Sequence, residues 1–349
     1  MHIDGDGGSL SERQAAVLRA MVLAYVGEAA PIGSDTLAHL LPIPLSSASI
    51  RTTLSELSRR GLVEKPHRSA GRVPTERGLR LFVDELLDPD DLGSYERRAI
   101  EHSFEDAAAA DGMVSVASQL LSERTQQLGF VLRPRLDRVV LRHVTLVQLS
   151  TERLLAILVS NTGATYRRVL EDARGIEQAE LDHIAAMLNE RIVGRTLSEV
   201  REALADEARA LRHHANRLLA RALQLGLQAL SDDEPERGDL VIETRLALFA
   251  QPEFRDPRRV RDLFAALETK ERLLEVLDEM LDQDGVRVAF GEEFDEPALR
   301  DCAVVATRYG ASHGPLGVLG VIGPSRMDYG RIIPLVDYLS EVITDKLSA

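Results

Sequence analysis

The sequence predicts an α+β chain made of several domains. Three observations support this prediction: helical periodicity around one short hairpin in the first 87 residues, strand-like runs on both sides of residue 200, and a seven-residue leucine repeat between those runs. A chain of 349 residues is long enough for two or three domains, each with its own core.

The first 45 residues predict two helices. Ser11 and Gln14 have the spacing of a capping box, and apolar residues then recur at intervals of three and four as far as Tyr25. Ser34 is placed to cap a short second helix, which the proline at Pro42 ends.

A third helix is predicted with Ser46 as its cap and Gly61 as its stop. Ile50, Leu54 and Leu57 form its inward face. Small or hydrogen-bonding residues with one arginine remain near or on the outward face: Ser47, Ala48, Arg51, Thr52 and Ser55. Such a face is typical of a helix in the DNA major groove, where bulk prevents close approach and arginine reads a guanine edge. For this helix alone, a small and polar solvated face is an equally good interpretation.

A basic hairpin follows the third helix. A strand-like run ends at Pro66, a turn carries Arg68 and Arg72, and the return begins at Val73, after which Thr75 caps another helix. Three helices, a basic hairpin and a helix are the order of a winged helix-turn-helix. In that fold the hairpin, or wing, lies along the phosphate backbone or reaches into the minor groove. The hairpin therefore makes DNA binding the favoured interpretation.

The charge distribution supports this interpretation. Residues 46–82 hold eight basic and three acidic side chains, a balance of +5, whereas the whole chain carries −14. Residues 83–349 alone carry −16, so they repel DNA while the basic region attracts it. Any DNA contact must therefore be local and oriented.

The residues of this region also resemble a known family. Its most specific string is PHRSAGRVPTERG, residues 66–78, within a longer match to the N-terminal domain of the HrcA family of heat-inducible transcription repressors. The resemblance makes Ser46 and Ile50, with Arg51, part of the recognition helix. Together with the basic residues of the hairpin, it gives the expected wing contacts: Lys65, His67, Arg68, Ser69, Gly71 and Arg72.

The region departs from the family pattern in two places. Thr52 stands where the family often has asparagine, which changes the side chain available beside Arg51 for a base edge. Arg59 and Arg60 stand where the family often has acidic residues. This basic pair is expected to strengthen phosphate contact rather than alter specificity.

The remainder of the chain predicts a sheet domain with a long insertion. The acidic, turn-rich segment 88–94 marks a domain boundary. Six strands are expected, at 138–149, 154–161, 166–171, 286–290, 303–309 and 316–322, with helices at 95–127, 177–192 and 328–347, the last interrupted at Pro334. The strings RDCAVVATRYG and GVLGVIGPSRMDYGRIIPLVDYL resemble the family's C-terminal part, and this resemblance implies a GAF-like antiparallel sheet domain.

The insertion carries a heptad pattern. Leucines recur every seven residues from Leu197, and an alanine follows each later leucine by four, which is typical of a close-packed helical seam. Self-association and packing within the same domain explain the pattern equally well. By resemblance the insertion belongs to a helical/β dimerisation domain, with these expected seam residues: Leu204, Ala208, Leu211, Ala215, Leu218, Ala222 and Leu225.

Enzyme chemistry finds no support in the sequence. The nine histidines form no motif with metal-ligand spacing, and no nucleophile elbow or Walker loop is present, so we expect no catalytic residues, metal or cofactor. Gly317, Gly320 and Gly323 lie on an apolar run and are expected to be strand glycines rather than a phosphate loop. The single cysteine, Cys302, excludes an internal disulfide and, with no signal peptide or membrane span expected, indicates a cytoplasmic protein.

These observations predict a cytoplasmic, dimeric, DNA-binding repressor. The expected domains are a winged helix-turn-helix at 9–88, a GAF-like domain at 89–194 and 271–349, and an inserted dimerisation domain at 195–270. The resemblance implies repression of class I heat-shock chaperone operons through the inverted-repeat operator CIRCE, with the GroE chaperonin as partner. The alternative is a small-ligand-responsive winged-helix regulator with its effector site in the GAF-like domain.

Overall fold

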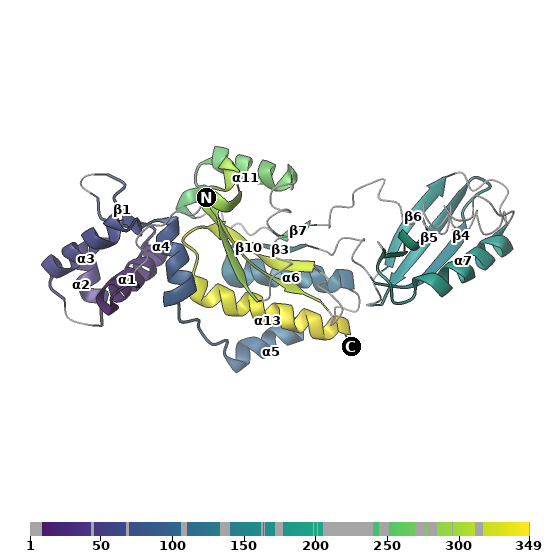
Figure 1. The fold of residues 1–349 in the computed structure, drawn as a ribbon, viewed down its shortest axis with the longest axis horizontal. Helices are drawn as coiled ribbons and strands as arrows, with labels where there is room; N and C mark the ends of the chain where they lie inside the picture. Colours follow the sequence, from purple (N-terminus) through teal and green to yellow (C-terminus); the bar gives the residue numbers. More distant parts are fainter. Residues whose placement is uncertain are drawn as a thin grey trace.

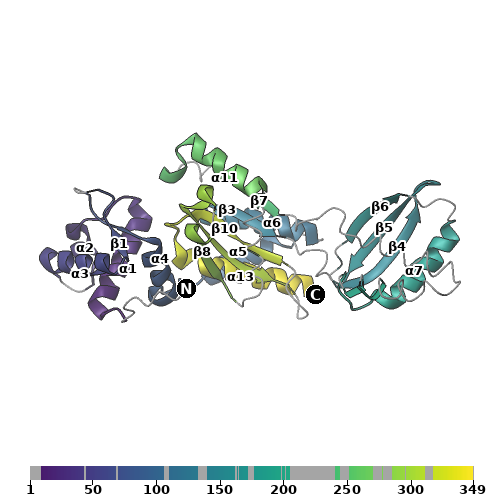
Figure 2. The ribbon, with the colours of Figure 1, turned by 45° about the horizontal axis from the view of Figure 1, so that its top comes forward.

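The computed structural model is an elongated mixed α/β molecule with three parts in a row (Figure 1). A helical head lies at one end, a central sheet with its helices forms the body, and a small separate sheet lies at the other end (Figure 2). The structure describes residues 9–42, 45–67, 70–105, 110–132, 140–161, 163, 165–171, 177–197, 199–200, 202–204, 240–243, 251–269, 277, 285–294, 296–310 and 317–348. The mixed α/β composition with antiparallel sheets confirms the coarse fold class.

The head, residues 9–88, contains the expected order of elements. They are α1 (Glu12–Glu28), α2 (Ser34–Leu40), α3 (Ser47–Arg59), β1 (Val63–Glu64), β2 (Val73–Pro74), α4 (Glu76–Leu81) and the π-helical turn η1 (Phe82–Leu86). The strands pair antiparallel, Val63 opposite Pro74 and Glu64 opposite Val73.

Local signals set most of the helix ends in the head. The capping box of Ser11 and the caps at Ser46 and Thr75 are confirmed, each side chain accepting from a backbone N–H three residues on. Ser34 was expected to cap α2, but it is the first residue of that helix, and Gly33 occupies the N-cap position. Gly61 ends α3 with a φ of 71°, a conformation that favours glycine.

The body is built on a five-stranded antiparallel sheet of order β7-β3-β10-β9-β8. The strands are β3 (Leu128–Leu132), β7 (Leu240–Glu243), β8 (Arg287–Phe290), β9 (Cys302–Tyr309) and β10 (Gly317–Pro324). Strand β3 was not expected from the sequence, whereas Gly317, Gly320 and Gly323 do lie on a strand as expected.

Helices cover both faces of the body's sheet. On one face lie α5 (Ser94–Ser103), α6 (Ala110–Thr125) and α13 (Tyr329–Ser348), whose core is continuous with that of the head. On the other lie α11 (Pro257–Thr269) and the short turns η4 (Pro252–Phe254), η5 (Gly291–Phe294) and η6 (Pro297–Leu299). Alternate residues of the strands supply the two cores, as the pleat requires.

Helix α13 continues through Pro334, although an interruption was expected there. A proline leaves the carbonyl four residues earlier without its helical donor, here the carbonyl of Gly330. The backbone N–H of Asp90, from the segment that leads out of the head, donates to this oxygen at 3.0 Å. A distant segment thus supplies the missing hydrogen bond, which is why local sequence did not reveal it.

The six expected strands divide between two sheets, which corrects the prediction of one sheet domain. The first three form a separate antiparallel sheet of β4 (Leu141–Gln148), β5 (Arg153–Ser160) and β6 (Thr165–Glu171), covered by α7 (Gln178–Ile192). We call these elements with residues 196–204 the outer unit. It has its own core, and the chain leaves the body's sheet after β3 and returns to it at β7.

The domain boundary expected at residue 194 therefore does not coincide with a structural division. Leu197, Val200 and Leu204 belong to the core of the outer unit together with residues of β4, β5 and α7. Beyond Leu204 the described residues resume at β7, which pairs with β3 in the body's sheet. The structural insertion thus starts after β3, because the strands of 141–171 pair with each other rather than with the body's sheet.

Candidate DNA-binding interface

The outward face of α3 is open, as the sequence predicted. Helix α3 lies at the free end of the head, away from the body (Figure 1). Ser47 is half-buried, and the following are exposed: Ser46, Ala48, Arg51, Thr52 and Ser55. The hydroxyls of Thr52 and Ser55 donate to carbonyls one turn earlier, at 3.1 and 2.8 Å, so both side chains lie close to the helix surface. The face can therefore approach a duplex closely.

One expected recognition residue faces the opposite way. Ile50 is 0% exposed and packs in the head's core with Leu54 and Leu57, so it positions α3 and contacts no DNA base from this structure. Thr53, which the sequence did not single out, is also buried, and its hydroxyl donates to the Ser49 carbonyl at 3.1 Å. The helical periodicity of Ile50, Leu54 and Leu57 already contained this information.

Arg51 is held by the start of α2. Its Nε donates to Ser34 Oγ at 3.1 Å, and its Nη2 lies 3.9 Å from Asp35 Oδ1. The hydroxyl of Ser47 donates to the same carboxylate oxygen at 2.6 Å. Asp35 thus contacts two residues of the expected recognition face.

The wing, residues 63–74, joins the head as a hairpin beside α3. Lys65 and His67 are exposed, whereas Arg68 and Ser69 lie outside the described residues. Gly71 is required by packing: a Cβ there would lie 2.5 Å from the Ile32 carbonyl oxygen. The absence of a side chain at Gly71 therefore allows close approach of the wing to the segment before α2.

Arg72 links the wing to α3. Its backbone N–H and C=O both pair with Ile32 at 2.9 Å, and its Nη2 donates to Ser55 Oγ at 3.2 Å. Its Nη1 is buried and has no hydrogen-bond partner in the described part of the chain. Burial also lowers the pKa of the guanidinium from its ordinary value. Arg72 was expected as a phosphate contact, yet its side chain is directed toward α3.

The expected phosphate-binding pair is divided by the structure. Arg59 is exposed near the end of α3. Arg60 is half-buried and donates from Nη1 to Gln14 Oε1 of α1 at 3.4 Å, while the Gln14 amide donates to Glu56 at 3.0 Å. Arg60 therefore takes part in a contact between α1 and the end of α3.

The head is fixed to the body through α4. The guanidinium of Arg80 lies 4.8 Å from the centre of the Phe290 ring, forms an ion pair with Glu293 and donates to the Val288 carbonyl at 2.5 Å. In addition, the backbone N–H of Glu292 donates to the carboxylate of Glu76 at 3.3 Å. These contacts restrict how the outward face of α3 is oriented relative to the body.

A second arginine joins the body to the end of α1. Arg326 forms a bidentate ion pair with Glu253 at 2.5 and 2.8 Å, and its Nη1 donates to the Val26 carbonyl at 3.3 Å. The side chains of Arg326 and Glu253 are only 12% and 20% exposed, so water screens this pair little. Burial and the nearby carboxylate of Glu253 also raise the pKa of Tyr25.

Comparison with known proteins identifies the family. The model of the "HrcA protein C terminal domain" matches residues 111–333. The "Heat-inducible transcription repressor HrcA" of Geobacter sulfurreducens is 37% identical over 336 residues, 96% of this chain and 97% of that one. The protein with the same name from Xanthomonas euvesicatoria is 36% identical over 334 residues, 96% of this chain and 95% of that one.

The chain belongs to the HrcA family of heat-inducible transcription repressors. The family is therefore one of transcriptional repressors rather than enzymes, and repression implies contact with DNA. A solved structure described as a hypothetical protein at 2.2 Å resolution shares the fold, with a TM-score of 0.61, 20% identity, and 97% and 99% of the two chains covered.

The residues expected to form the HrcA dimer seam are mostly outside the described residues, from Ala208 to Leu225. Leu204 is described, and it does not fit the expected role: it is 1% exposed and packs in the core of the outer unit. The start of the heptad series thus packs within its own unit, in a core that it shares with residues of β4, β5 and α7. The seven-residue leucine spacing alone could not distinguish self-association from packing within one domain, because both produce the same spacing.

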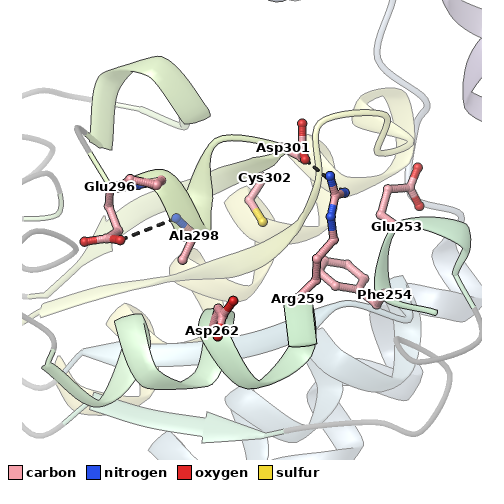
Figure 3. A pocket seen from close by; sticks show the side chains of 9 residues that line it. Glu253, Phe254, Arg259, Asp262, Glu296, Ala298, Asp301 and Cys302 are labelled. Atoms are coloured by element: carbon pink, nitrogen blue, oxygen red, sulfur yellow. Dashed lines mark hydrogen bonds and ion pairs between the residues drawn. The ribbon is translucent and has the colours of Figure 1, made fainter. Parts of the chain in front are cut away.

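The body of this HrcA chain contains a cavity of about 360 Å³ between η4, α11, η6 and β9 (Figure 3). Arg259 pairs with Asp301 at 3.0 Å on its wall, and the Glu296 carboxylate accepts from the Ala298 N–H at 3.4 Å. The thiol of Cys302 points into the cavity, and burial raises its pKa to about 12. Among the described residues, no group of three or more potential metal ligands occurs.

No helix in the described ranges of the chain is long and apolar enough to cross a membrane.

Proposed function

We propose that the head is a winged helix-turn-helix domain that binds double-stranded DNA through α3 and the wing. The observation that carries this proposal is the open, small-residue face of α3 beside exposed Lys65 and His67. Residues 46–82, which include both elements, carry +5 on a chain whose net charge is −14. Because attraction to phosphate is confined to this region, DNA is directed to it and away from the acidic remainder.

We further propose that the chain represses class I heat-shock chaperone operons as a homodimer bound to the inverted-repeat operator CIRCE. One recognition face of this size reads few base pairs, so a second copy on the other half-site supplies the remaining affinity. The fixed contacts of Arg80 and Arg326 between head and body support this arrangement, since they limit how far two heads can move apart. By resemblance to the family, the GroE chaperonin keeps the repressor active in the cytoplasm until heat diverts it.

Dimerisation is proposed to use the GAF-like body's insertion, including the heptad seam of residues 208–225. This proposal is tested by sedimentation of a variant in which Leu211 and Leu218 are both replaced by Asp. We expect monomers, because charged residues at a seam must be desolvated on association. If the variant sediments as a dimer, the seam belongs to an internal core and the dimer interface lies elsewhere.

The main test measures operator binding directly. Fluorescence anisotropy with the full-length protein compares an inverted-repeat operator with a scrambled duplex of equal length at one salt concentration, because affinity depends on salt. We expect the operator to bind at least about a thousand times more tightly than the scrambled duplex. Equal affinity for both would contradict the proposal.

A second candidate function rests on the cavity in the body. Its volume of about 360 Å³ is within the usual range for small-molecule sites, which supports a ligand-responsive regulator. A metabolite library screened by thermal shift, followed by operator binding without chaperonin, tests this candidate. A ligand that changes operator affinity by itself would favour it over control by the chaperonin.

A further inference from the structure

An exposed carboxylate lies where DNA is proposed to bind. Asp35 is in the first turn of α2, next to the N-terminal half of α3, and its side chain is 77% exposed. A negative charge at this place repels phosphates and weakens binding to DNA of any sequence. We therefore expect Asp35 to contribute to DNA recognition in some other way.

The contacts of Asp35 indicate that role. One oxygen, Oδ1, accepts from the Ser47 hydroxyl at 2.6 Å and lies 3.9 Å from Arg51 Nη2. Ser34, its neighbour, accepts from Arg51 Nε at 3.1 Å. Two successive residues of α2 thus hold the Nε and Nη2 edge of the arginine that is expected to read a base.

Holding one edge of the guanidinium restricts an otherwise flexible side chain. Arg51 is 68% exposed, so packing does not fix its rotamer, whereas the polar contacts with Ser34 and Asp35 restrain it. The fork geometry of arginine gives specificity only when the plane of the guanidinium meets the base edge in register. A carboxylate also discourages Arg51 from contacting a phosphate instead, because any phosphate that approaches Arg51 must also approach Asp35.

We propose that Asp35 is a positioning residue that sets sequence specificity. It orients Arg51 for base readout and penalises binding to DNA in which Arg51 finds no matching base. This inference depends on the proposed DNA-binding function of the head. It assigns to α2 a part in specificity although the residue itself makes no base contact.

The test is the ratio of affinities for operator and scrambled duplex, measured by anisotropy at one salt concentration. Asp35→Asn keeps the shape and an acceptor for Ser47 but removes the charge. We expect scrambled DNA to bind about threefold more tightly and the operator about threefold more weakly, so that the ratio falls about tenfold. Asp35→Glu, which restores the charge, should recover part of the ratio.

Two further variants separate positioning from a general charge effect. Glu64→Gln removes one negative charge from the exposed base of the wing, and it should change both affinities by the same factor. In an Arg51→Ala background, Asp35→Asn should leave the ratio unchanged, because no arginine remains to be oriented. Circular dichroism and the melting temperature of each variant confirm that the head is folded.

The outcomes distinguish this inference from the proposed function. If the unmodified protein does not prefer the operator, the proposed function fails. If it does prefer the operator but Asp35→Asn shifts both affinities equally, the positioning role is overturned and DNA binding is retained. A tenfold fall in the ratio that persists without Arg51 also overturns it.

Discussion

Replacing Arg80 by alanine should loosen the attachment of the head to the body. The substitution removes the stacking on Phe290, the ion pair with Glu293 and the hydrogen bond to the Val288 carbonyl. Arg80 is 35% exposed and Glu293 is 50% exposed, so the ion pair contributes only about 0.5 kcal/mol. The contact with the ring contributes about 1 kcal/mol. The hydrogen bond from a charged donor contributes about 1 kcal/mol or somewhat more.

Together these contacts indicate a loss of about 2 to 3 kcal/mol in the free energy of unfolding. Urea titration followed by far-UV circular dichroism measures this loss by linear extrapolation. Arg77→Ala is the matched control, because Arg77 lies exposed on the same helix. It should change the free energy of unfolding by less than about 0.5 kcal/mol. If Arg80→Ala is no more destabilising than the control, the attachment does not depend on Arg80.

Four further predictions concern single residues. Arg51→Ala should weaken operator binding by about 1 to 3 kcal/mol while leaving binding to scrambled DNA much less affected, and an equal loss on both in anisotropy would contradict base readout. Gly71→Ala should lower the free energy of unfolding by about 1 to 3 kcal/mol, because its Cβ meets the Ile32 carbonyl. Gly27→Ala, with open space around it in α1, should instead raise it by about 0.5 to 1 kcal/mol in the same urea titration. The Cys302 thiol, with its pKa raised to about 12, should not react with iodoacetamide at pH 8 until the protein unfolds. Because the thiol ionises at lower pH in the unfolded chain than in the folded one, the free energy of unfolding should fall as the pH rises above about 9.

The head shows how much local sequence can determine. Side-chain caps at Ser11, Ser46 and Thr75 and the glycine at Gly61 set helix ends as predicted, since each depends on residues within one turn. The strand-like run that ends at Pro66 and the turn after it placed the hairpin as well. The helical spacing of Ile50, Leu54 and Leu57 assigned Ile50 to the core, and the resemblance alone suggested that it contacts DNA.

The hydrogen-bond partners of the side chains on this face of the head were not predictable in the same way. Arg60 and Arg72 are basic, as residues that contact phosphate usually are. In the structure, however, Arg60 donates to Gln14 and Arg72 donates to Ser55. Asp35 was unremarked in the sequence because nothing local links it to Arg51, which is 16 residues later. A charged residue identifies a possible contact, whereas the fold decides which partner is within reach.

The sequence by itself determined the types of element, most helix ends, the basic region and the family to which the chain belongs. Tertiary structure decided which strands pair. Strand β3 pairs with β7 across more than 100 residues, and the strands between them form their own sheet, because pairing depends on which edges meet in space and not on local alternation. It also decided that the Gly330 carbonyl receives a donor from Asp90, which allows α13 to pass through Pro334. Hydrogen bonds between segments distant in sequence leave no periodic signal, so only the folded chain reveals them.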